Sequence, residues 1–269
     1  MPTLPSKISG PLTVVGDVHG QTDLLASLIA RLQARADFTD RWLVFLGDFV
    51  DRGPNPRAAL DAVLALRQHH PKFAAVMGNH DLALVAALGL VPTSDERNWP
   101  ARYLASYNAA STFASYGVPF GDLPALAAAL PPAHKQFLAG LPWCVEHPEY
   151  LIVHAGLLSN VPFAKQLHAL RRRDFTLNRP AWLCDRRLAR TPIPADCPLT
   201  VISGHVQVEQ VTFSERRILM DTTGGFGGEL SAVLLPERLV LTSGPFISDA
   251  ASSNPGNEPG SSNSTGENS

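Results

Sequence analysis

The sequence predicts an α/β fold with a mixed, mainly parallel central sheet, additional antiparallel strands and flanking helices. Short apolar runs rich in β-branched residues alternate with segments of helical periodicity over residues 12–88. Glycine-flanked polar motifs recur every 31 residues, close to the length of one strand–helix–strand unit. Short alternating segments then occupy residues 207–242, a pattern typical of antiparallel strands and hairpins.

The amino-terminal part supplies three strand–helix repeats. Each predicted strand is a short apolar run, and each following segment places apolar residues three or four positions apart. Buried strands separated by helices favour parallel pairing. We expect strands at residues 12–15, 42–46 and 73–77, and helices at residues 24–32, 54–67 and 82–88.

The composition changes after these repeats. Residues 90–148 are rich in alanine, proline and aromatic residues, and we interpret them as an inserted helical cap. Helical patterns within the cap lie near residues 102–115 and 123–138. Two further core strands are expected at residues 150–153 and 199–202. The strands on both sides of the cap are therefore expected to form one core.

The end of the sequence differs from the rest. Serine, asparagine, glycine, proline and glutamate dominate it, without apolar periodicity. Such a segment cannot bury enough surface to offset its chain entropy. We expect one catalytic domain over residues 1–245 and a disordered tail over residues 246–269.

Composition also excludes several classes of protein. Lysine and arginine total 22 against 24 aspartate and glutamate, a net charge of −2 that provides no basic field for nucleic acid. No apolar run is long enough for a membrane span, and the first residues lack the apolar core of a signal peptide, so a cytoplasmic protein is expected. Cys144, Cys184 and Cys197 fit neither a disulfide framework nor a CxxC metal site, and we interpret them as reduced structural thiols.

Polar residues follow the predicted strands at corresponding points. Asp17, Asp48 and Asn79 are each 31 residues apart, and His154 and His205 come directly after or close behind the two later strands. Parallel strands end at one edge of a sheet, where α/β proteins bind ligands. We therefore expect all five side chains to converge at a single edge.

These residue types are those of a metal site. Carboxylate, imidazole and amide oxygen together suit Mn²⁺, Fe²⁺ or Zn²⁺. Six protein ligands are too many for one open catalytic ion, but they suit two ions about 3.5–4 Å apart that share a carboxylate. Asp48 lies on the middle motif and is the natural bridge. The predicted ligands are Asp17, His19, Asp48, Asn79, His154 and His205.

The motifs are also similar to those of a known family. Residues 16–20 read Gly-Asp-Val-His-Gly, residues 47–53 read Gly-Asp-Phe-Val-Asp-Arg-Gly, and residues 78–81 read Gly-Asn-His-Asp. His-Ala-Gly at 154–156 and Gly-His at 204–205 follow. In this order they resemble the phosphoprotein phosphatase family of calcineurin-like metallophosphoesterases, in its bacterial serine/threonine type. The resemblance covers roughly residues 12–235 and implies a metallophosphoesterase sandwich.

The resemblance implies a role for each motif residue. His80 would protonate the leaving oxygen with Asp51 as its carboxylate partner, and Arg52 would hold phosphate oxygens. A histidine beside a carboxylate is expected to stay protonated near neutral pH, and a guanidinium can donate to two phosphate oxygens at once. Asp17 and His19 would bind the first ion, Asp48 would bridge, and the second ion would be bound by Asn79, His154 and His205.

The implied reaction is hydrolysis of phosphoserine and phosphothreonine on proteins or peptides. A hydroxide bridging two divalent ions would attack phosphorus in line, with Mn²⁺ as the favoured metal and Fe or Zn as alternatives. The family usually carries a second phosphate-binding arginine between its fourth and fifth motifs, and Arg186 is our choice for it. Asp81 we interpret as a helix N-cap.

Other functions share the same motifs. A symmetrical dinucleoside tetraphosphatase, or another nucleotide phosphohydrolase, fits His154-Ala155-Gly156 equally well, and small phosphoesters also fit such a site. The acidic Asp51 favours the protein phosphatase, because the tetraphosphatases usually carry a small residue at that position. A nuclease uses the same core chemistry, whereas an inactive scaffold would lack ligands, and none is missing. Nothing in the sequence indicates the oligomeric state.

Overall fold

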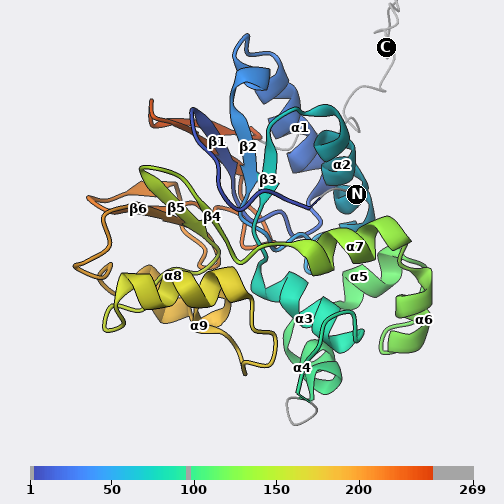
Figure 1. The fold of residues 1–269 in the computed structure, drawn as a ribbon. Coiled ribbons are helices and arrows are strands. Elements are labelled where there is room, and N and C mark those ends of the chain that lie inside the picture. The colour runs from blue at the N-terminus through green and yellow to red at the C-terminus, as the bar shows by residue number, and fades with distance from the viewer. Residues whose placement is uncertain (1–2, 95–97, 245–269) are drawn as a thin grey trace, which may run out of the picture.

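The computed structural model describes residues 3–94 and 98–244, and two five-stranded sheets form its centre (Figure 1). In the first sheet, β1, β2 and β3 pair in parallel, while β9 and β10 are antiparallel additions. Its spatial order is β10 (Leu239–Thr242), β9 (Ser231–Leu235), β1 (Leu12–Val15), β2 (Trp42–Phe45) and β3 (Phe73–Ala75).

The second sheet is also mixed. Strands β5, β6 and β8 pair in parallel, and β4 and β7 close its two sides in antiparallel pairs. The predicted α/β fold with mixed sheets and flanking helices is confirmed, although the strands divide between two sheets. The spatial order of the second sheet is β4 (Cys144–Glu146), β5 (Tyr150–Val153), β6 (Thr200–Ser203), β8 (Arg217–Leu219) and β7 (Thr212–Phe213).

An apolar layer joins the two sheets. Val14 and Val44 of the first sheet belong to the same buried cluster as Ile152 and Ile202 of the second. Their neighbours along the strands, such as Phe45, belong instead to the cluster that includes the helices. Because side chains alternate along a strand, each sheet contributes one face to the sandwich and the other to a helical layer.

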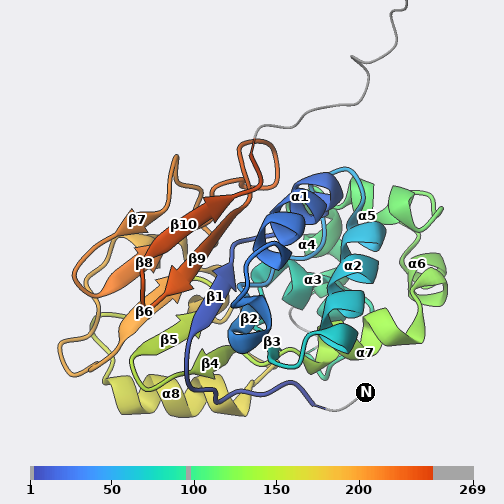
Figure 2. The same cartoon turned by 90° about the horizontal axis from the view of Figure 1, so that it is seen from above.

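Helices cover the outer faces of the sandwich. Helices α1 (Thr22–Gln33) and α2 (Pro56–His69) lie beside the first sheet, and α8 (Phe163–Arg172) and α9 (Ala181–Cys184) lie beside the second (Figures 1 and 2). Helix α2 begins at a proline, and the Asn55 side chain accepts a hydrogen bond from Ala58 N at 3.1 Å. The short 3₁₀ helices are η1 (Phe38–Asp40) and η3 (Arg186–Ala189).

The expected helical cap contains more and shorter helices than the periodicity indicated. The break between α4 and α5 includes Asn108, whose φ is +51°, and the break between α6 and α7 includes Pro131. Strand β4 then follows within residues 90–148 as part of the second sheet. Helix α3 (Asn79–Ala87) precedes this region and corresponds to the helix expected at residues 82–88. The helices within the region are α4 (Trp99–Ser106), α5 (Ala110–Ser115), α6 (Leu123–Ala129) and α7 (Pro132–Gly140).

Three further predictions concern the carboxyl-terminal tail, the cysteines and membrane-spanning helices. The domain boundary at 245 and the tail over 246–269 lie outside the described residues. Cys144, Cys184 and Cys197 are buried and form no disulfide with one another. Among residues 3–94 and 98–244, no helix has the length and apolar character needed to cross a bilayer.

Candidate active site

Loops that follow five strands meet at one end of the sandwich. Asp17, Asp48 and Asn79 follow β1, β2 and β3 of the first sheet, whereas His154 and His205 follow β5 and β6 of the second. The expected convergence is therefore present, but it joins two sheets instead of one sheet edge. His205 N donates to Asp17 Oδ2 at 2.9 Å, and Asn79 Oδ1 lies 2.7 Å from His205 Nδ1 and 3.0 Å from His154 Nε2.

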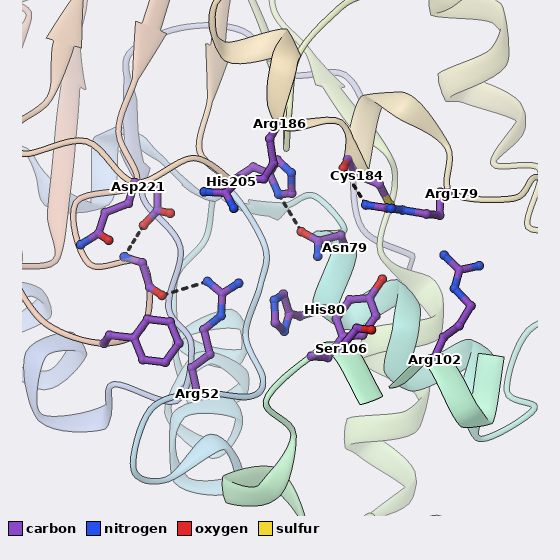
Figure 3. A pocket seen from close by; sticks show the side chains of 14 residues that line it. Arg52, Asn79, His80, Arg102, Ser106, Arg179, Cys184, Arg186, His205 and Asp221 are labelled. Carbon is purple, nitrogen blue, oxygen red and sulfur yellow. Dashed lines mark hydrogen bonds between the residues drawn. The ribbon is translucent and has the colours of Figure 1, made fainter. Parts of the chain in front are cut away.

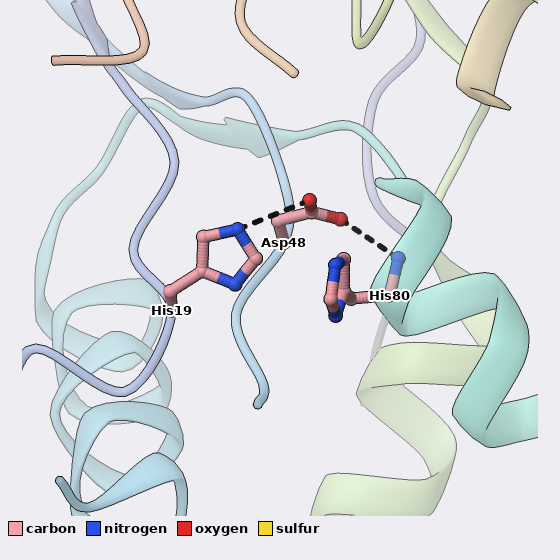
Figure 4. A group of neighbouring side chains, drawn as sticks. All are labelled: His19, Asp48 and His80. Atoms are coloured by element: carbon pink, nitrogen blue, oxygen red, sulfur yellow. Dashed lines mark hydrogen bonds and ion pairs between the residues drawn. The ribbon is translucent and has the colours of Figure 1, made fainter. Parts of the chain in front are cut away.

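Asp48 lies at the centre of this cluster. Its Oδ2 is 3.3 Å from Nε2 of both His19 and His154, and its Oδ1 accepts a hydrogen bond from His80 N at 2.9 Å (Figure 4). Two groups of potential metal ligands share this carboxylate, one with His19 and His80 and the other with His154 and His205. A carboxylate placed between two groups of ligands suits a bridging role.

Hydrogen bonds from the ring nitrogens orient two of the histidines. His19 Nδ1 donates to Val50 O at 2.9 Å, and His154 Nδ1 donates to Leu46 O at 2.8 Å. In each ring the remaining nitrogen, Nε2, faces Asp48. Such backbone partners set the tautomer of metal-binding histidines and fix the direction of the ligating lone pair.

The electrostatics of the cluster indicate a need for positive charge. Burial raises the pKa of Asp17 well above its usual range, and the charges of Asp221 and Asp48 add to the shift. Burial disfavours a charged His154, but Asp48 and Asp17 outweigh it and raise its pKa to about 10. Asp17 Oδ1 and His205 Nε2 are buried without a hydrogen-bond partner among the described residues. The donor types and these unpaired atoms fit divalent cations.

Two glycines allow the motifs to approach one another. A Cβ on Gly78 would collide with the carboxylate of Asp48, and a Cβ on Gly204 would collide with that of Asp17. Both glycines immediately precede predicted metal ligands, Asn79 and His205. A side chain at either position would displace a carboxylate from the cluster.

Asp81 has a different role from the expected N-cap. It is the third residue of α3, and the N-cap is Gly78. Its Oδ2 accepts hydrogen bonds from Asp48 N at 2.8 Å and Gly78 N at 3.0 Å, and its Oδ1 accepts one from Phe49 N at 2.9 Å. Burial and the charge of Asp48 raise its pKa to about 7. The buried Asp81 carboxylate thus links the loop after β2 to the loop after β3 through hydrogen bonds to the backbone of both.

His80 and Asp51 form the pair that the resemblance implies. His80 Nδ1 lies 2.8 Å from Asp51 Oδ2, and the imidazole stands edge-on to the rings of His19 and Tyr107. Burial lowers the pKa of His80, and the charges of Asp48 and Asp51 oppose that shift only in part. The expectation that the carboxylate alone keeps this histidine protonated is therefore not met, because the ring is almost completely buried.

Arg52 lies at the entrance to the metal-ligand cluster. Its Nη1 donates to Gly224 O at 2.8 Å and lies 3.1 Å from His19 Nε2. Its guanidinium is 5.3 Å from the ring centre of Phe226. No ion pair joins it to the neighbouring Asp51 among the described residues, so its charge is directed at the pocket instead.

A pocket of about 340 Å³ opens over these residues, and arginine is its most frequent lining residue. In Figure 3, Arg52 lies on the side of Asp221, Arg186 lies near His205, and Arg102 and Arg179 lie on the opposite side of His80. Among the described residues, Asp221 is the one acidic residue that lines the pocket. We call the four basic residues the arginine cluster: Arg52, Arg102, Arg179 and Arg186.

The sequence indicated only part of this cluster. Arg186, the predicted second phosphate-binding arginine, lines the pocket. Arg171, which lies in the same interval of the sequence, instead forms an ion pair with Glu146 at 2.5 Å. Arg179 lies in the interval where the resemblance expects an arginine, but no motif distinguished it from its neighbours. Arg102 belongs to the cap, where its position on α4 gave no functional signal. Arg102 donates to Asn178 Oδ1 at 2.8 Å, and no member of the cluster pairs with a carboxylate among the described residues.

The sequence matches the calcineurin-like phosphoesterase family over residues 10–228. The chain belongs to this family. The match spans both sheets as far as the glycine-rich loop after β8, so the calcineurin-like phosphoesterase fold accounts for the strand-end loops described above. Membership confirms the superfamily that the motifs predicted.

One curated relative is named for an activity on dinucleotides. A symmetrical bis(5'-nucleosyl)-tetraphosphatase of Bordetella parapertussis is 31% identical over 175 residues, which is 65% of this chain and 54% of that protein. The chain thus spans about half the length of this curated relative.

Two solved structures share the fold. A protein provisionally assigned as a diadenosine tetraphosphatase has a TM-score of 0.59 at 20% identity, over 90% of this chain and 97% of its own. The cold-active protein-tyrosine phosphatase of a psychrophilic Shewanella species has a TM-score of 0.59 at 19% identity, over 89% of this chain and 82% of its own. At these identities the similarity concerns the fold.

Proposed function

We propose that this calcineurin-like phosphoesterase hydrolyses dinucleoside tetraphosphates symmetrically, producing two nucleoside diphosphates. The arginine cluster is the observation that carries the proposal. A phosphoserine side chain bears about two negative charges near neutral pH, whereas a tetraphosphate bridge bears more charge over a longer chain. Four guanidinium groups line one pocket, with a single aspartate among the described lining residues, and they match the charge of such a chain.

The arrangement of the cluster supports an extended substrate. Arg52 lies beside His19 of the metal-ligand cluster, while Arg102 and Arg179 lie beyond His80 (Figure 3). We propose that Arg52 binds the phosphate beside the metal ligands and that the outer arginines, Arg102 and Arg179, bind neighbouring phosphates of the chain. Phe226 also lines the pocket, and its side chain is 68% exposed. An exposed aromatic ring there offers a stacking surface for a nucleobase. The tetraphosphatase name of the Bordetella relative adds support.

The proposed chemistry assigns a role to each group. Two divalent cations held by Asp17, His19, Asp48, Asn79, His154 and His205 would supply positive charge and lower the pKa of a water molecule.

The protein's own side chains then act on the substrate. Arg52 directs its guanidinium at the phosphoryl oxygens, and Asp51 holds the imidazole of His80 so that Nε2 faces the pocket. The negatively charged phosphates of the substrate lie beside His80, and their charge raises the pKa of the ring and favours a protonated Nε2. That nitrogen donates its proton to the leaving oxygen. Arg186 binds phosphate from the His205 side of the pocket.

A protein phosphatase is the second candidate, and the Asp51–His80 pair is the observation that favours it. The alkoxide of a serine is a poor leaving group and requires protonation, whereas a nucleoside diphosphate leaves more readily. A buried and well-oriented histidine is therefore of greatest use with phosphoserine or phosphothreonine. Both candidates use the same metal ligands, Arg52 and His80, and they differ in what the outer arginines bind.

A comparison of substrates distinguishes the candidates. With Mn²⁺ present, kcat/KM is measured for diadenosine tetraphosphate and for a phosphoserine peptide, and the nucleotide products are separated chromatographically. The proposal predicts a higher kcat/KM for the dinucleotide and ADP as its sole product. A higher value for the phosphopeptide, or ATP and AMP in equal amounts, would contradict it. Loss of both activities in Asp48→Asn protein excludes a contaminating enzyme.

A further inference from the structure

The buried carboxylate of Asp51 has more partners than His80 alone. Its Oδ2 is bonded to His80 Nδ1, while its Oδ1 accepts hydrogen bonds from Tyr103 Oη at 2.7 Å and Thr112 Oγ1 at 2.6 Å. Tyr103 belongs to α4 and Thr112 to α5. Asp51, Tyr103 and Thr112 are all completely buried, so no bulk water substitutes for these bonds.

The direction of these hydrogen bonds follows from the donors. Thr112 Oγ1 accepts from Asp51 N at 3.0 Å, so its single proton is available for Asp51 Oδ1. Burial and the charge of Asp51 raise the pKa of Tyr103 well above its usual value, and its hydroxyl keeps its proton. Both oxygens of Asp51 therefore accept hydrogen bonds, two at Oδ1 and one at Oδ2, and these bonds fix the orientation of the carboxylate.

The backbone at the same position also depends on the cap. Asp51 and Arg52 have φ values of +68° and +64°, a left-handed conformation that is unfavourable for residues with a side chain. Strained residues of this kind persist only where surrounding contacts hold them. Here Thr112 binds the N–H of Asp51, and Asn108 O accepts from the N–H of Arg52 at 3.3 Å.

We propose that Tyr103 and Thr112 are positioning residues for the general acid, and that the cap helices α4 and α5 act through Asp51 on the orientation of His80. This inference rests on the proposed acid role of His80. The strand-end motifs supply His80 and Asp51, but the hydroxyl groups that orient Asp51 come from a separate layer of the protein. Displacement of the cap would turn the imidazole without disturbing a metal ligand.

The dependence of the rate on the leaving group tests this proposal. Protonation matters most for a poor leaving group, so phenyl phosphate is compared with p-nitrophenyl phosphate, which releases a more acidic phenol. Tyr103→Phe and Thr112→Val should lower kcat on phenyl phosphate by about 10- to 100-fold. This is less than the roughly 100- to 10,000-fold contribution of a general acid, because the acid is misaligned and not removed. On p-nitrophenyl phosphate they should lower kcat by less than about 3-fold, with KM little changed on both substrates.

Matched variants separate positioning from structural damage. Thr112→Ser keeps the hydroxyl and should restore the rate on phenyl phosphate, whereas Thr112→Val, with the same shape as threonine, should not. Tyr150→Phe removes a hydroxyl at the far end of β5 and should leave the ratio of the two rates unchanged. Equal losses on both substrates, or no difference between Thr112→Ser and Thr112→Val, would overturn the proposal.

His80→Gln distinguishes failure of this inference from failure of the proposed mechanism. A selective loss on phenyl phosphate in His80→Gln but not in Tyr103→Phe would refute positioning by the cap and leave the general acid in place. An equal loss on both substrates in His80→Gln would refute the acid role itself. Thermal unfolding of each variant shows whether a reduced rate reflects reduced folding.

Discussion

The two sides of the pocket are built in different ways. The predicted metal ligands contact one another directly and are buried, apart from the partly exposed His205. Most of them lie on loops, and the backbone is strained at His19, Asp48 and His205, with φ of +42°, +49° and +66°. Members of the arginine cluster reach the pocket on long side chains and bind neutral groups, such as Gly224 O for Arg52 and Asn178 for Arg102. Contacts among the predicted metal ligands fix their positions, whereas the positive charges of the arginine cluster are not neutralised by a carboxylate among the described residues. We therefore propose that the side with the predicted metal ligands carries out hydrolysis and that the arginine cluster selects the substrate.

The largest effect is expected from the centre of the ligand cluster. Asp48→Asn removes the charge that two histidines and both proposed ions share, so kcat should fall on the order of 1,000-fold, the range for loss of one preorganised electrostatic group. The steady-state rate with Mn²⁺ on diadenosine tetraphosphate and on p-nitrophenyl phosphate measures it. The rate should fall by a similar factor on both substrates. Near-normal turnover of either substrate would contradict the proposal that the predicted metal ligands carry out hydrolysis.

Substitution of Asp81, which binds the backbone of two motif loops, is expected to lower the stability of the protein. In Asp81→Asn an amide replaces one carboxylate oxygen, so at least one buried N–H loses its acceptor, at a cost of about 1–3 kcal/mol in the free energy of unfolding. Urea unfolding measures the change. The exposed Asp23, replaced in the same way, should alter stability by less than about 0.5 kcal/mol. Equal stability of the two variants would show that Asp81 does not hold the loops.

Substitution of the outer arginines should change the KM for diadenosine tetraphosphate but not the KM for p-nitrophenyl phosphate. Arg102→Met and Arg179→Met each remove one guanidinium but keep an unbranched apolar side chain. KM for diadenosine tetraphosphate should rise about 10-fold, equivalent to about 1.4 kcal/mol of binding, with KM for p-nitrophenyl phosphate nearly unchanged. Arg190→Met, at an exposed position outside the pocket, is the control. A uniform change for both substrates would remove the distinction between the two sides of the pocket.

The smallest effect is expected from the exposed ring beside Arg52. Phe226→Leu keeps an apolar side chain but removes the cation–π contact, worth about 0.5–1 kcal/mol at an exposed site. KM for diadenosine tetraphosphate should rise about 2- to 5-fold from this loss alone. A larger increase confined to dinucleotides would indicate base stacking on Phe226, whereas an unchanged KM would exclude any contribution of the ring.

The sequence predicted the ligand side of the pocket far better than the arginine side. Asp17, Asp48 and Asn79 could be recognised because glycines, strand ends and a regular spacing recur together, each imposed by local backbone geometry. The division of the strands between two sheets could not be recognised, since β4 and β8 have three residues each and too little alternation to show their pairing.

The remaining site residues depend on contacts between distant segments. Tyr103 and Thr112 lie 52 and 61 residues after Asp51, on helices whose periodicity reports only their apolar faces. The sequence around Arg102 does not distinguish it from other helical arginines. Asp81 was interpreted as a helix N-cap because its hydrogen bonds to the backbone of Asp48 and Phe49 cannot be inferred from the sequence. Tertiary packing determines these roles, and a local pattern cannot show them.

The central claim is that Asp48 lies between two metal ions. Protein treated with EDTA and then dialysed is titrated calorimetrically with Mn²⁺, for the natural sequence and for Asp48→Asn, with His80→Gln as a control that retains all six ligands. We expect two bound ions per chain for the natural protein and for His80→Gln, and weaker binding with loss of at least one ion for Asp48→Asn. One ion per chain in the natural protein, or two undiminished sites in Asp48→Asn, would contradict it.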